Sequence, residues 1–143
     1  MLTVLGFAPF YFFAVPAITL AVLLGFCHKS QTSLQAALLG FCFGMGLFCA
    51  GVTWIYVSLH DFGAMPMSAA VAALIVLCAY LSLFPAASFW ILTKSRLTSP
   101  FIWASVAAAL WMLFEWLRGN LFTGFPWLTL GYSQAPFSPL AGF

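Results

Sequence analysis

The sequence predicts an all-α protein that crosses a membrane about four times. Of its 143 residues, 65% are hydrophobic and 4% are charged, whereas ordinary soluble domains carry roughly 25% charged residues. The apolar residues form long continuous runs, with a mean hydropathy of +1.13 over the chain, and not the alternating pattern of membrane β-strands. Because the net charge is only +2 and no basic stripe is present, we expect no nucleic-acid partner.

We expect one partial transmembrane domain over residues 1–143, which opens with an incomplete helix. Residues 1–8 are apolar, but at about 1.5 Å per residue they cover roughly 12 Å of a roughly 30 Å hydrocarbon core. The first full span is predicted over residues 12–27. Pro16 lies in its first turn, where the missing backbone N–H does least harm, and a polar connection begins at His28.

The second predicted span, residues 34–59, carries a stripe of small side chains. At 100° per residue, five positions fall within about 60° of arc. They are Ala37, Gly40, Gly44, Gly51 and Ser58. Such a face lets another helix approach closely, either within this chain, which we prefer, or in a second copy, so a monomer is favoured. His60 and Asp61 in the next loop are expected to face water or to cap the following helix.

The third and fourth predicted spans, residues 67–92 and 101–117, are joined by a loop that holds Lys94 and Arg96. The fourth span contains Glu115, an acidic residue inside an apolar run. A carboxylate that faces lipid is costly, so Glu115 should point into the bundle and find a partner there. Arg118, three residues further along the same helix face, is the obvious one.

Residues 119–143 cannot continue as a membrane-spanning helix, because glycines and prolines recur throughout them. These are Gly119, Gly124, Pro126, Gly131 and Pro136. Each proline removes a backbone donor, yet the segment is rich in large apolar side chains such as Phe125 and Trp127. Irregular backbone is tolerated at membrane depth only inside protein or beside a wet cavity. We therefore predict a re-entrant or interfacial segment that forms the floor of a site.

The basic residues predict an orientation. Lys29 lies in the first loop and Lys94 and Arg96 lie in the third, whereas the second loop has neither Lys nor Arg. The positive-inside rule then places the first and third loops in the cytoplasm. The second loop and the segment after Arg118 should face the opposite side of the membrane together.

The four cysteines are interpreted as small apolar side chains. Cys27, Cys42, Cys49 and Cys78 belong to apolar runs and show no CxxC spacing. We expect neither a metal site nor a cofactor in this chain.

Several stretches resemble the membrane domain of the apolipoprotein N-acyltransferase family of bacterial inner-membrane enzymes. The matching stretches are GFCFGMGLFCAGVTWIYVSLHDFGAMP (residues 40–66), AYLSLF (residues 79–84) and FEWLRGNLFTGFPWLTLGYSQ (residues 114–134). The FAPF stretch (residues 7–10) fits the end of the family's first helix. The resemblance covers nearly the whole chain, and its most specific part is the long motif at residues 114–134.

The resemblance implies a two-step acyl transfer. In the family, a nitrilase-like periplasmic domain carries a Glu-Lys-Cys triad, and its Cys takes an acyl chain from a phospholipid as a thioester. The amine of diacylglyceryl-cysteine at the N-terminus of an apolipoprotein then accepts that chain. The four cysteines here do not match that nucleophile. We therefore expect a fragment without the nitrilase-like domain and without catalytic residues, inactive alone, in the bacterial inner membrane with its site facing the periplasm.

The resemblance also implies substrate-contacting residues. Trp127 matches the tryptophan of the family's FPW motif, and a large amphipathic ring on irregular backbone can wall an acyl channel. Arg118 could contact a lipid phosphate or be paired with Glu115, and both options stay open. Tyr132 and Gln134 could contact a lipid or bond within the irregular segment. The full set of candidates is Glu115, Arg118, Phe125, Trp127, Tyr132 and Gln134.

Two other functions fit the composition. The first is a small transporter or channel subunit built around Glu115 and Arg118. A transporter should carry an internal repeat with a second interrupted helix, and the sequence offers only Pro85 as a candidate interruption. The second is a structural membrane anchor, which should tolerate replacement of Trp127 and Arg118.

Overall fold

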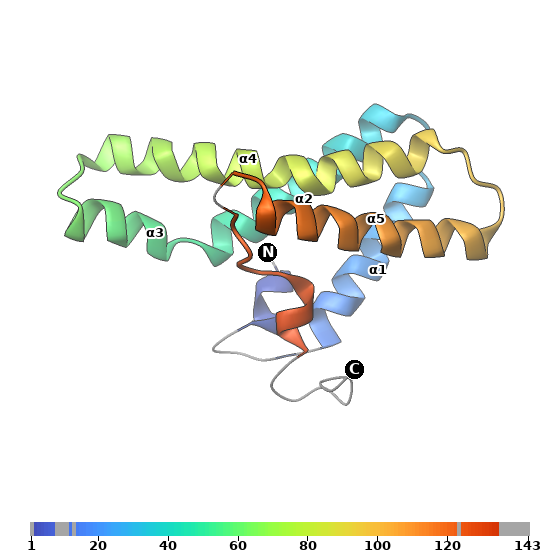
Figure 1. Cartoon of the computed structure of the whole chain (residues 1–143), viewed down its shortest axis with the longest axis horizontal. Helices are drawn as coiled ribbons and strands as arrows, with labels where there is room; N and C mark the ends of the chain where they lie inside the picture. The colour runs from blue at the N-terminus through green and yellow to red at the C-terminus, as the bar shows by residue number, and fades with distance from the viewer. Residues whose placement is uncertain (1, 8–11, 13, 123, 135–143) are drawn as a thin grey trace.

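The computed structural model describes residues 2–7, 12, 14–122 and 124–134, and the regular elements within these ranges are all helical (Figure 1). The helices are α1 (Ala14–His28), α2 (Ser33–Gly51), α3 (Trp54–Val57), α4 (Met67–Lys94) and α5 (Pro100–Asn120). Short 3₁₀ turns form η1 (Leu2–Gly6) and η3 (Leu130–Ser133), and η2 (Ser58–Phe62) is a π-helical turn. This confirms the predicted all-α class.

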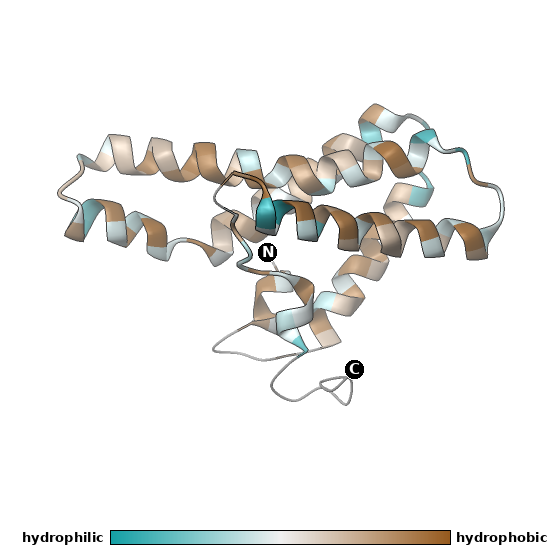
Figure 2. Ribbon diagram, in the orientation of Figure 1, coloured by the Kyte–Doolittle hydropathy of each residue, from teal (hydrophilic) through white to brown (hydrophobic). Residues whose placement is uncertain are grey.

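Three of these helices, α2, α4 and α5, are long and apolar enough to cross a membrane, with 19, 28 and 21 residues. Figure 2 shows apolar residues along their lengths and hydrophilic ones mostly near the ends. The predicted first span is shorter than expected, because α1 has 15 residues, and at about 1.5 Å per residue it reaches roughly 22 Å. The predicted last span is longer than expected and continues to Asn120.

The main helix pair is α2 against α4, and its contact surface is the small-residue stripe. A Cβ added to Gly40 would lie 2.6 Å from the carbonyl oxygen of Pro85, and one added to Gly44 would lie 2.9 Å from the side chain of Ser82. Ser82 is fully buried and donates a hydrogen bond to the Cys78 carbonyl oxygen. The preferred interpretation of the stripe, close packing within the chain, is therefore confirmed for Gly40 and Gly44.

The predicted continuous span over residues 34–59 is wrong, because the helix is interrupted after Gly51. The Val52 N–H still donates to the Phe48 carbonyl oxygen, but Val52 itself adopts φ −118° and ψ 21°. Beyond it, the Ile55 N–H donates to the Val52 carbonyl oxygen, three residues back, so the chain makes a tighter helical turn where α3 begins. Gly51 has no side chain, and the side chain of Leu128 occupies the space where its Cβ would lie.

Beyond this interruption, α3 and η2 fold back along the first half of α4, and this helical hairpin extends past the end of α5 (Figure 1). His60 Nδ1 donates to the Met65 carbonyl oxygen across 2.9 Å, and its ring stacks on Tyr56 with centroids 5.4 Å apart. His60 therefore closes the turn before α4, but the first turn of α4 has no side-chain cap, so the expected capping role is not found.

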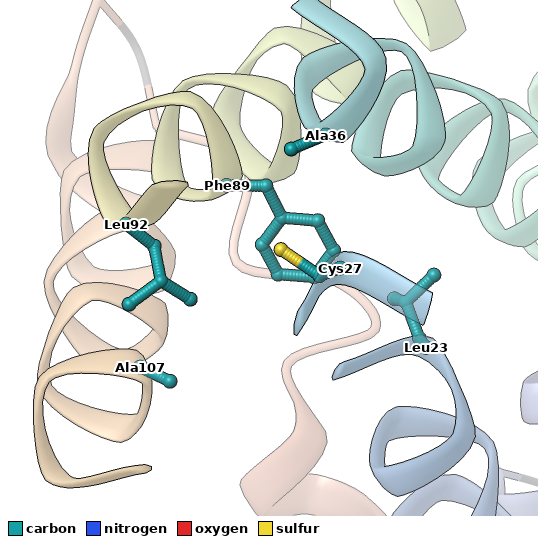
Figure 3. Close-up of a cluster of buried hydrophobic side chains, with 6 residues drawn as sticks. All are labelled: Leu23, Cys27, Ala36, Phe89, Leu92 and Ala107. Carbon is teal, nitrogen blue, oxygen red and sulfur yellow. The ribbon is translucent and has the colours of Figure 1, made fainter. Parts of the chain in front are cut away.

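Two apolar clusters hold the helices together. Figure 3 shows the first cluster, to which α1, α2, α4 and α5 all contribute, with Phe89 and Cys27 at its centre. The second lies between α2 and α4 and gathers Leu47, Phe48, Val52, Cys78 and Leu81. Cys27 and Cys78 are buried in these clusters, as expected for small apolar side chains. The second cluster also contacts Phe125 and Leu128, so it forms the base on which the irregular segment rests.

Candidate functional site

The chain reverses direction at the end of α5. The Phe125 N–H donates to the Arg118 carbonyl oxygen across 2.9 Å, so the chain returns to the helix end that it has just left. Gly124 adopts φ +70°, and a Cβ there would overlap the Gly119 carbonyl oxygen. Glycine is thus required at this position, because it alone adopts such a conformation without a steric penalty. We call residues 124–130 the returning segment.

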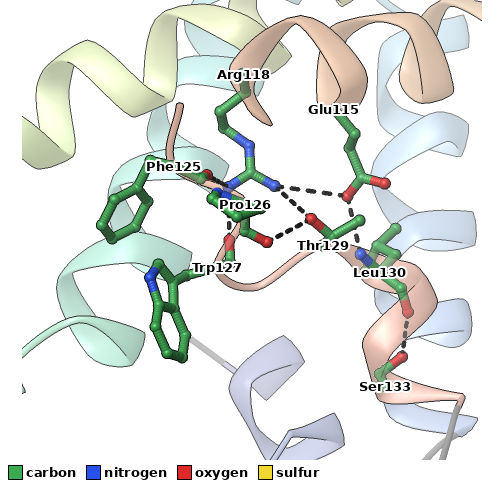
Figure 4. A network of polar contacts seen from close by, with 8 residues as sticks. All are labelled: Glu115, Arg118, Phe125, Pro126, Trp127, Thr129, Leu130 and Ser133. Carbon is green, nitrogen blue, oxygen red and sulfur yellow. Dashed lines mark hydrogen bonds and ion pairs between the residues drawn. The ribbon is translucent and has the colours of Figure 1, made fainter. Parts of the chain in front are cut away.

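Arg118 binds the returning segment from inside the protein. Its side chain is only 3% exposed. Its Nη1 donates to the carbonyl oxygens of Phe125 and Trp127, and its Nη2 donates to Thr129 Oγ1 across 3.3 Å (Figure 4). A planar guanidinium suits this task because its donors diverge in a fixed fork. One side chain therefore forms hydrogen bonds to three residues of the segment, at positions 125, 127 and 129.

Glu115 completes the attachment from one turn earlier on α5. Its Oε1 accepts a hydrogen bond from the Leu130 N–H across 2.9 Å and lies 4.0 Å from Arg118 Nη2. Thr129 Oγ1 in turn donates to the Pro126 carbonyl oxygen across 2.7 Å. The same face of α5 thus binds the backbone carbonyl oxygens of Phe125 and Trp127 and the backbone N–H of Leu130. We call the pair of Glu115 and Arg118, with these bonds, the clamp.

Trp127 is bound by the clamp through its backbone, while its side chain stays exposed. Its carbonyl oxygen is bound by Arg118, yet its residue surface is 55% exposed. Figure 4 shows the indole pointing away from the guanidinium. The ring meets the edge of Trp54 on α3, with centroids 5.6 Å apart and planes at 61°. The clamp therefore fixes the backbone of Trp127, while α3 contacts its ring.

The next residue, Leu128, attaches the segment to the interruption between α2 and α3. It adopts φ 59°, a left-handed conformation that costs a residue with a side chain roughly 1–2 kcal/mol. Its side chain lies in the space that Gly51 leaves open, against the buried Val52. Apolar packing at this point offsets the backbone strain.

The six predicted site residues are only partly brought together. Glu115, Arg118, Phe125 and Trp127 all belong to the clamp or the returning segment. Tyr132 lies beyond them in η3 and is 60% exposed, and Gln134 follows η3 and donates to Ser133 Oγ across 3.0 Å. Trp54 and Thr129 were missed by the sequence reasoning. Trp54 lay inside a span predicted to be unbroken, and a lone threonine in an irregular segment carries no signal.

Two hollows border the clamp. A small one of about 20 Å³ lies among α2, α4, α5 and Leu128, with Glu115, Arg118 and Trp111 in its wall. An open groove of about 340 Å³ lies on the other side of Glu115. Its walls are Met112, Glu115, Trp116, Gly119, Asn120, Pro126 and Thr129. The groove combines apolar walls with a carboxylate, an amide and a hydroxyl. Within the described residues, no three His, Cys, Asp or Glu side chains gather as a metal site would require.

Comparison with known proteins adds an independent finding. A family model described as "Apolipoprotein N-acyltransferase N-terminal domain" matches residues 1–143. The chain is 63% identical over 141 residues to the apolipoprotein N-acyltransferase of Nitrosomonas europaea, covering 99% of this chain and 28% of that protein. It is 41% identical over 144 residues to that of Vibrio cholerae, covering 100% of this chain and 28% of that protein. The chain thus spans little more than a quarter of the length of these relatives.

Proposed function

The chain belongs to the apolipoprotein N-acyltransferase family, and from this premise we propose that its clamp and returning segment hold lipid substrates for acyl transfer. The acyl donor would be a phospholipid, and the acceptor would be the N-terminal amine of diacylglyceryl-cysteine in an apolipoprotein. The described helices are those of a multi-pass membrane domain. The bacterial inner membrane, with the clamp on the periplasmic side, is the location that the family and the basic loops favour.

One observation carries the proposal, namely that a buried arginine fixes the backbone of an exposed tryptophan. Arg118 binds the carbonyl oxygen of Trp127, and the indole remains 55% exposed. A surface tryptophan needs no such support for packing, because its ring is not buried in the core. An indole combines a large apolar surface with one N–H donor, so it suits the boundary between acyl chains and polar headgroups.

The chemistry itself is proposed to lie outside these 143 residues. The family resemblance implies that a thiolate attacks the phospholipid ester carbonyl, so that a C–S bond forms, the ester C–O bond breaks and a lysophospholipid leaves. The substrate amine then attacks the thioester, an amide forms, and the thiol is released. We propose that this chain presents the two lipids to a Glu-Lys-Cys triad on a nitrilase-like domain.

The contacts of Arg118 favour one of its two predicted roles. Its donors are directed at the returning segment and its charge faces Glu115, with 3% of the side chain exposed. A guanidinium used in this way has little surface left for a lipid phosphate. We assign Arg118 to holding the segment, and we propose that the exposed Trp127 and Tyr132, with the half-buried Phe125 and Gln134, are the lipid-contacting side chains.

The open groove beside Glu115 is a second feature in favour of a lipid ligand. Its volume of about 340 Å³ falls at the lower end of the range of small-molecule sites, roughly 300–1,000 Å³. Met112, Trp116 and Pro126 offer apolar surface there, and Asn120 and Thr129 offer polar atoms close by. Such a mixed lining suits a molecule with a polar head and an apolar chain.

The test is the Trp127→Ala variant of a full-length protein that carries this domain. We expect acyl transfer to a diacylglyceryl peptide to be lost, while expression and membrane insertion match the wild type, because the clamp bonds only the backbone of residue 127. Trp90→Ala is the matched control, since Trp90 is 42% exposed, stacks under Lys94 near the end of α4 and, within the described residues, makes no ring or hydrogen-bond contact with the clamp. Wild-type transfer by Trp127→Ala would remove Trp127 from the site and favour a structural anchor.

A further inference from the structure

Three positions on α2 and α3, spaced three residues apart, face the clamp and the returning segment. The Phe48 ring lies 5.2 Å from the Arg118 guanidinium carbon. Three residues on, Gly51 leaves the space that Leu128 fills. Three residues further, Trp54 meets the Trp127 ring. Phe48, Gly51 and Trp54 thus form one surface, which we call the seat of the returning segment.

The helix that carries the seat is interrupted between Phe48 and Trp54. At 100° per residue, positions 48 and 54 of an unbroken α-helix would point about 120° apart. Phe48 contacts Arg118 on α5 and Trp54 contacts Trp127 in the returning segment, and the helix between them is interrupted at Val52 and Thr53. Directly beyond the interruption, the Trp54 ring lies against Trp127.

The exposure of Trp54 indicates that its ring is not there to fill the core. Trp54 is 47% exposed and begins a helix of only four residues. Its edge-to-face contact is with a tryptophan that is itself 55% exposed. Pairs of this geometry add about 0.5–1.5 kcal/mol beyond the area they bury. Such a contact does little for the fold and much for the orientation of the Trp127 indole.

We propose that Trp54 is a positioning residue for Trp127, and that Gly51 assists it by leaving room for Leu128. This inference rests on the proposed function, in which the Trp127 indole contacts lipid. The clamp fixes the backbone of Trp127 but leaves the side-chain torsions free. Trp54 restricts those torsions, so the indole is already oriented when a substrate arrives.

The experiment measures kcat and KM for acyl transfer to a diacylglyceryl peptide by the full-length protein. For Trp54→Ala we expect kcat/KM to fall by between about twofold and about tenfold, which is the free energy of an edge-to-face pair expressed as a ratio. Trp54→Phe keeps an aromatic edge at this position and should stay within about twofold of the wild type. The control Trp90→Ala should match the wild type. Trp90 lies in the second half of α4 and is 42% exposed, close to the 47% of Trp54.

A double-variant cycle separates positioning from a general loss of structure. In a Trp127→Phe background, Trp54→Ala should cost clearly less than in the wild type, because the two rings act as one unit. Thermal unfolding of Trp54→Ala should match that of Trp90→Ala. Gly51→Ala, whose new methyl would displace Leu128, should lower kcat/KM in the same direction as Trp54→Ala, which gives a second variant if the first folds poorly.

Three results would overturn the inference: wild-type kcat/KM in Trp54→Ala, equal damage from Trp54→Phe and Trp54→Ala, or full additivity in the cycle. Failure of the proposed function looks different. In that case Trp127→Ala itself would transfer acyl chains normally. If Trp127→Ala is inactive and Trp54→Ala is normal, the proposed function stands and the positioning role of Trp54 is rejected.

Discussion

Replacing Arg118 by methionine should release the returning segment from α5. The variant loses three hydrogen bonds from a buried charged donor to Phe125, Trp127 and Thr129. It also leaves Glu115 without the cation 4.0 Å away. Each hydrogen bond to a charged group contributes about 1.5–3 kcal/mol, but the three share one side chain and do not add fully. Removal of one member of a buried ion pair costs about 3–5 kcal/mol, and we adopt that range.

Hydrogen exchange followed by mass spectrometry on the detergent-solubilised protein is the appropriate assay, because the loss is local. The reporting amides are those of Phe125, bonded to the Arg118 carbonyl, and Leu130, bonded to Glu115. A loss of about 3–5 kcal/mol should accelerate their exchange by roughly two to three and a half orders of magnitude. Arg118→Lys keeps the charge but lacks the planar fork, so it should fall between the wild type and Arg118→Met.

Arg96→Met is the matched control, since Arg96 is an exposed arginine in the loop after α4. It should leave the exchange of Phe125 and Leu130 unchanged. If Arg118→Met also left these amides within threefold of the wild type, the clamp would not be what holds the segment. In that case the apolar contact of Leu128 with Gly51 would have to carry the attachment.

Three further predictions test the packing, the orientation and the site of chemistry. Gly40→Ala should destabilise the protein by about 1–3 kcal/mol, because its Cβ would lie 2.6 Å from the Pro85 carbonyl oxygen. The control Gly25→Ala, with open space around the new methyl group, should leave the stability unchanged. Equal thermal midpoints for the two variants would contradict the close α2–α4 contact. A membrane-impermeant thiol reagent applied from the outside should label Asp61→Cys but not Ser95→Cys, both at exposed positions, and the reverse pattern would invert the topology. Incubated by itself with a phospholipid labelled in its acyl chains, this 143-residue chain should acquire no thioester-linked label, and a labelled cysteine would show that chemistry does occur within it.

Much of the site was predictable from local sequence. The FPW stretch among glycines predicts irregular backbone with a fixed aromatic ring, because proline and glycine exclude a continuous helix. Glu115 and Arg118 are three residues apart, so a shared helix face follows from helical geometry alone. Ser133, a polar residue in the same irregular stretch, is fully buried and donates to the Leu130 carbonyl oxygen. Burial in an irregular segment depends on what folds over it, so local pattern does not predict it.

The interruption after Gly51 shows where local pattern stops being informative. Residues 34–59 read as one long apolar helix, and neither a glycine nor a threonine in such a run breaks it by propensity alone. At the interruption, Gly51 lies against Leu128, 77 positions further along the chain. Helical propensities differ by less than about 1 kcal/mol for such residues, so tertiary packing decides between a continuous and an interrupted helix.

By itself, the sequence determined that this protein is helical, that it belongs in a membrane, and that its last described stretch could not be one more straight span. Those properties follow from hydropathy and backbone chemistry, which act within a few residues. Only the tertiary structure decided that Arg118 binds backbone carbonyl oxygens, that α2 ends at Gly51, and that Trp54 meets Trp127. They depend on contacts between separate segments, and the Arg118 bonds among them satisfy backbone carbonyl oxygens of the returning segment where water is scarce.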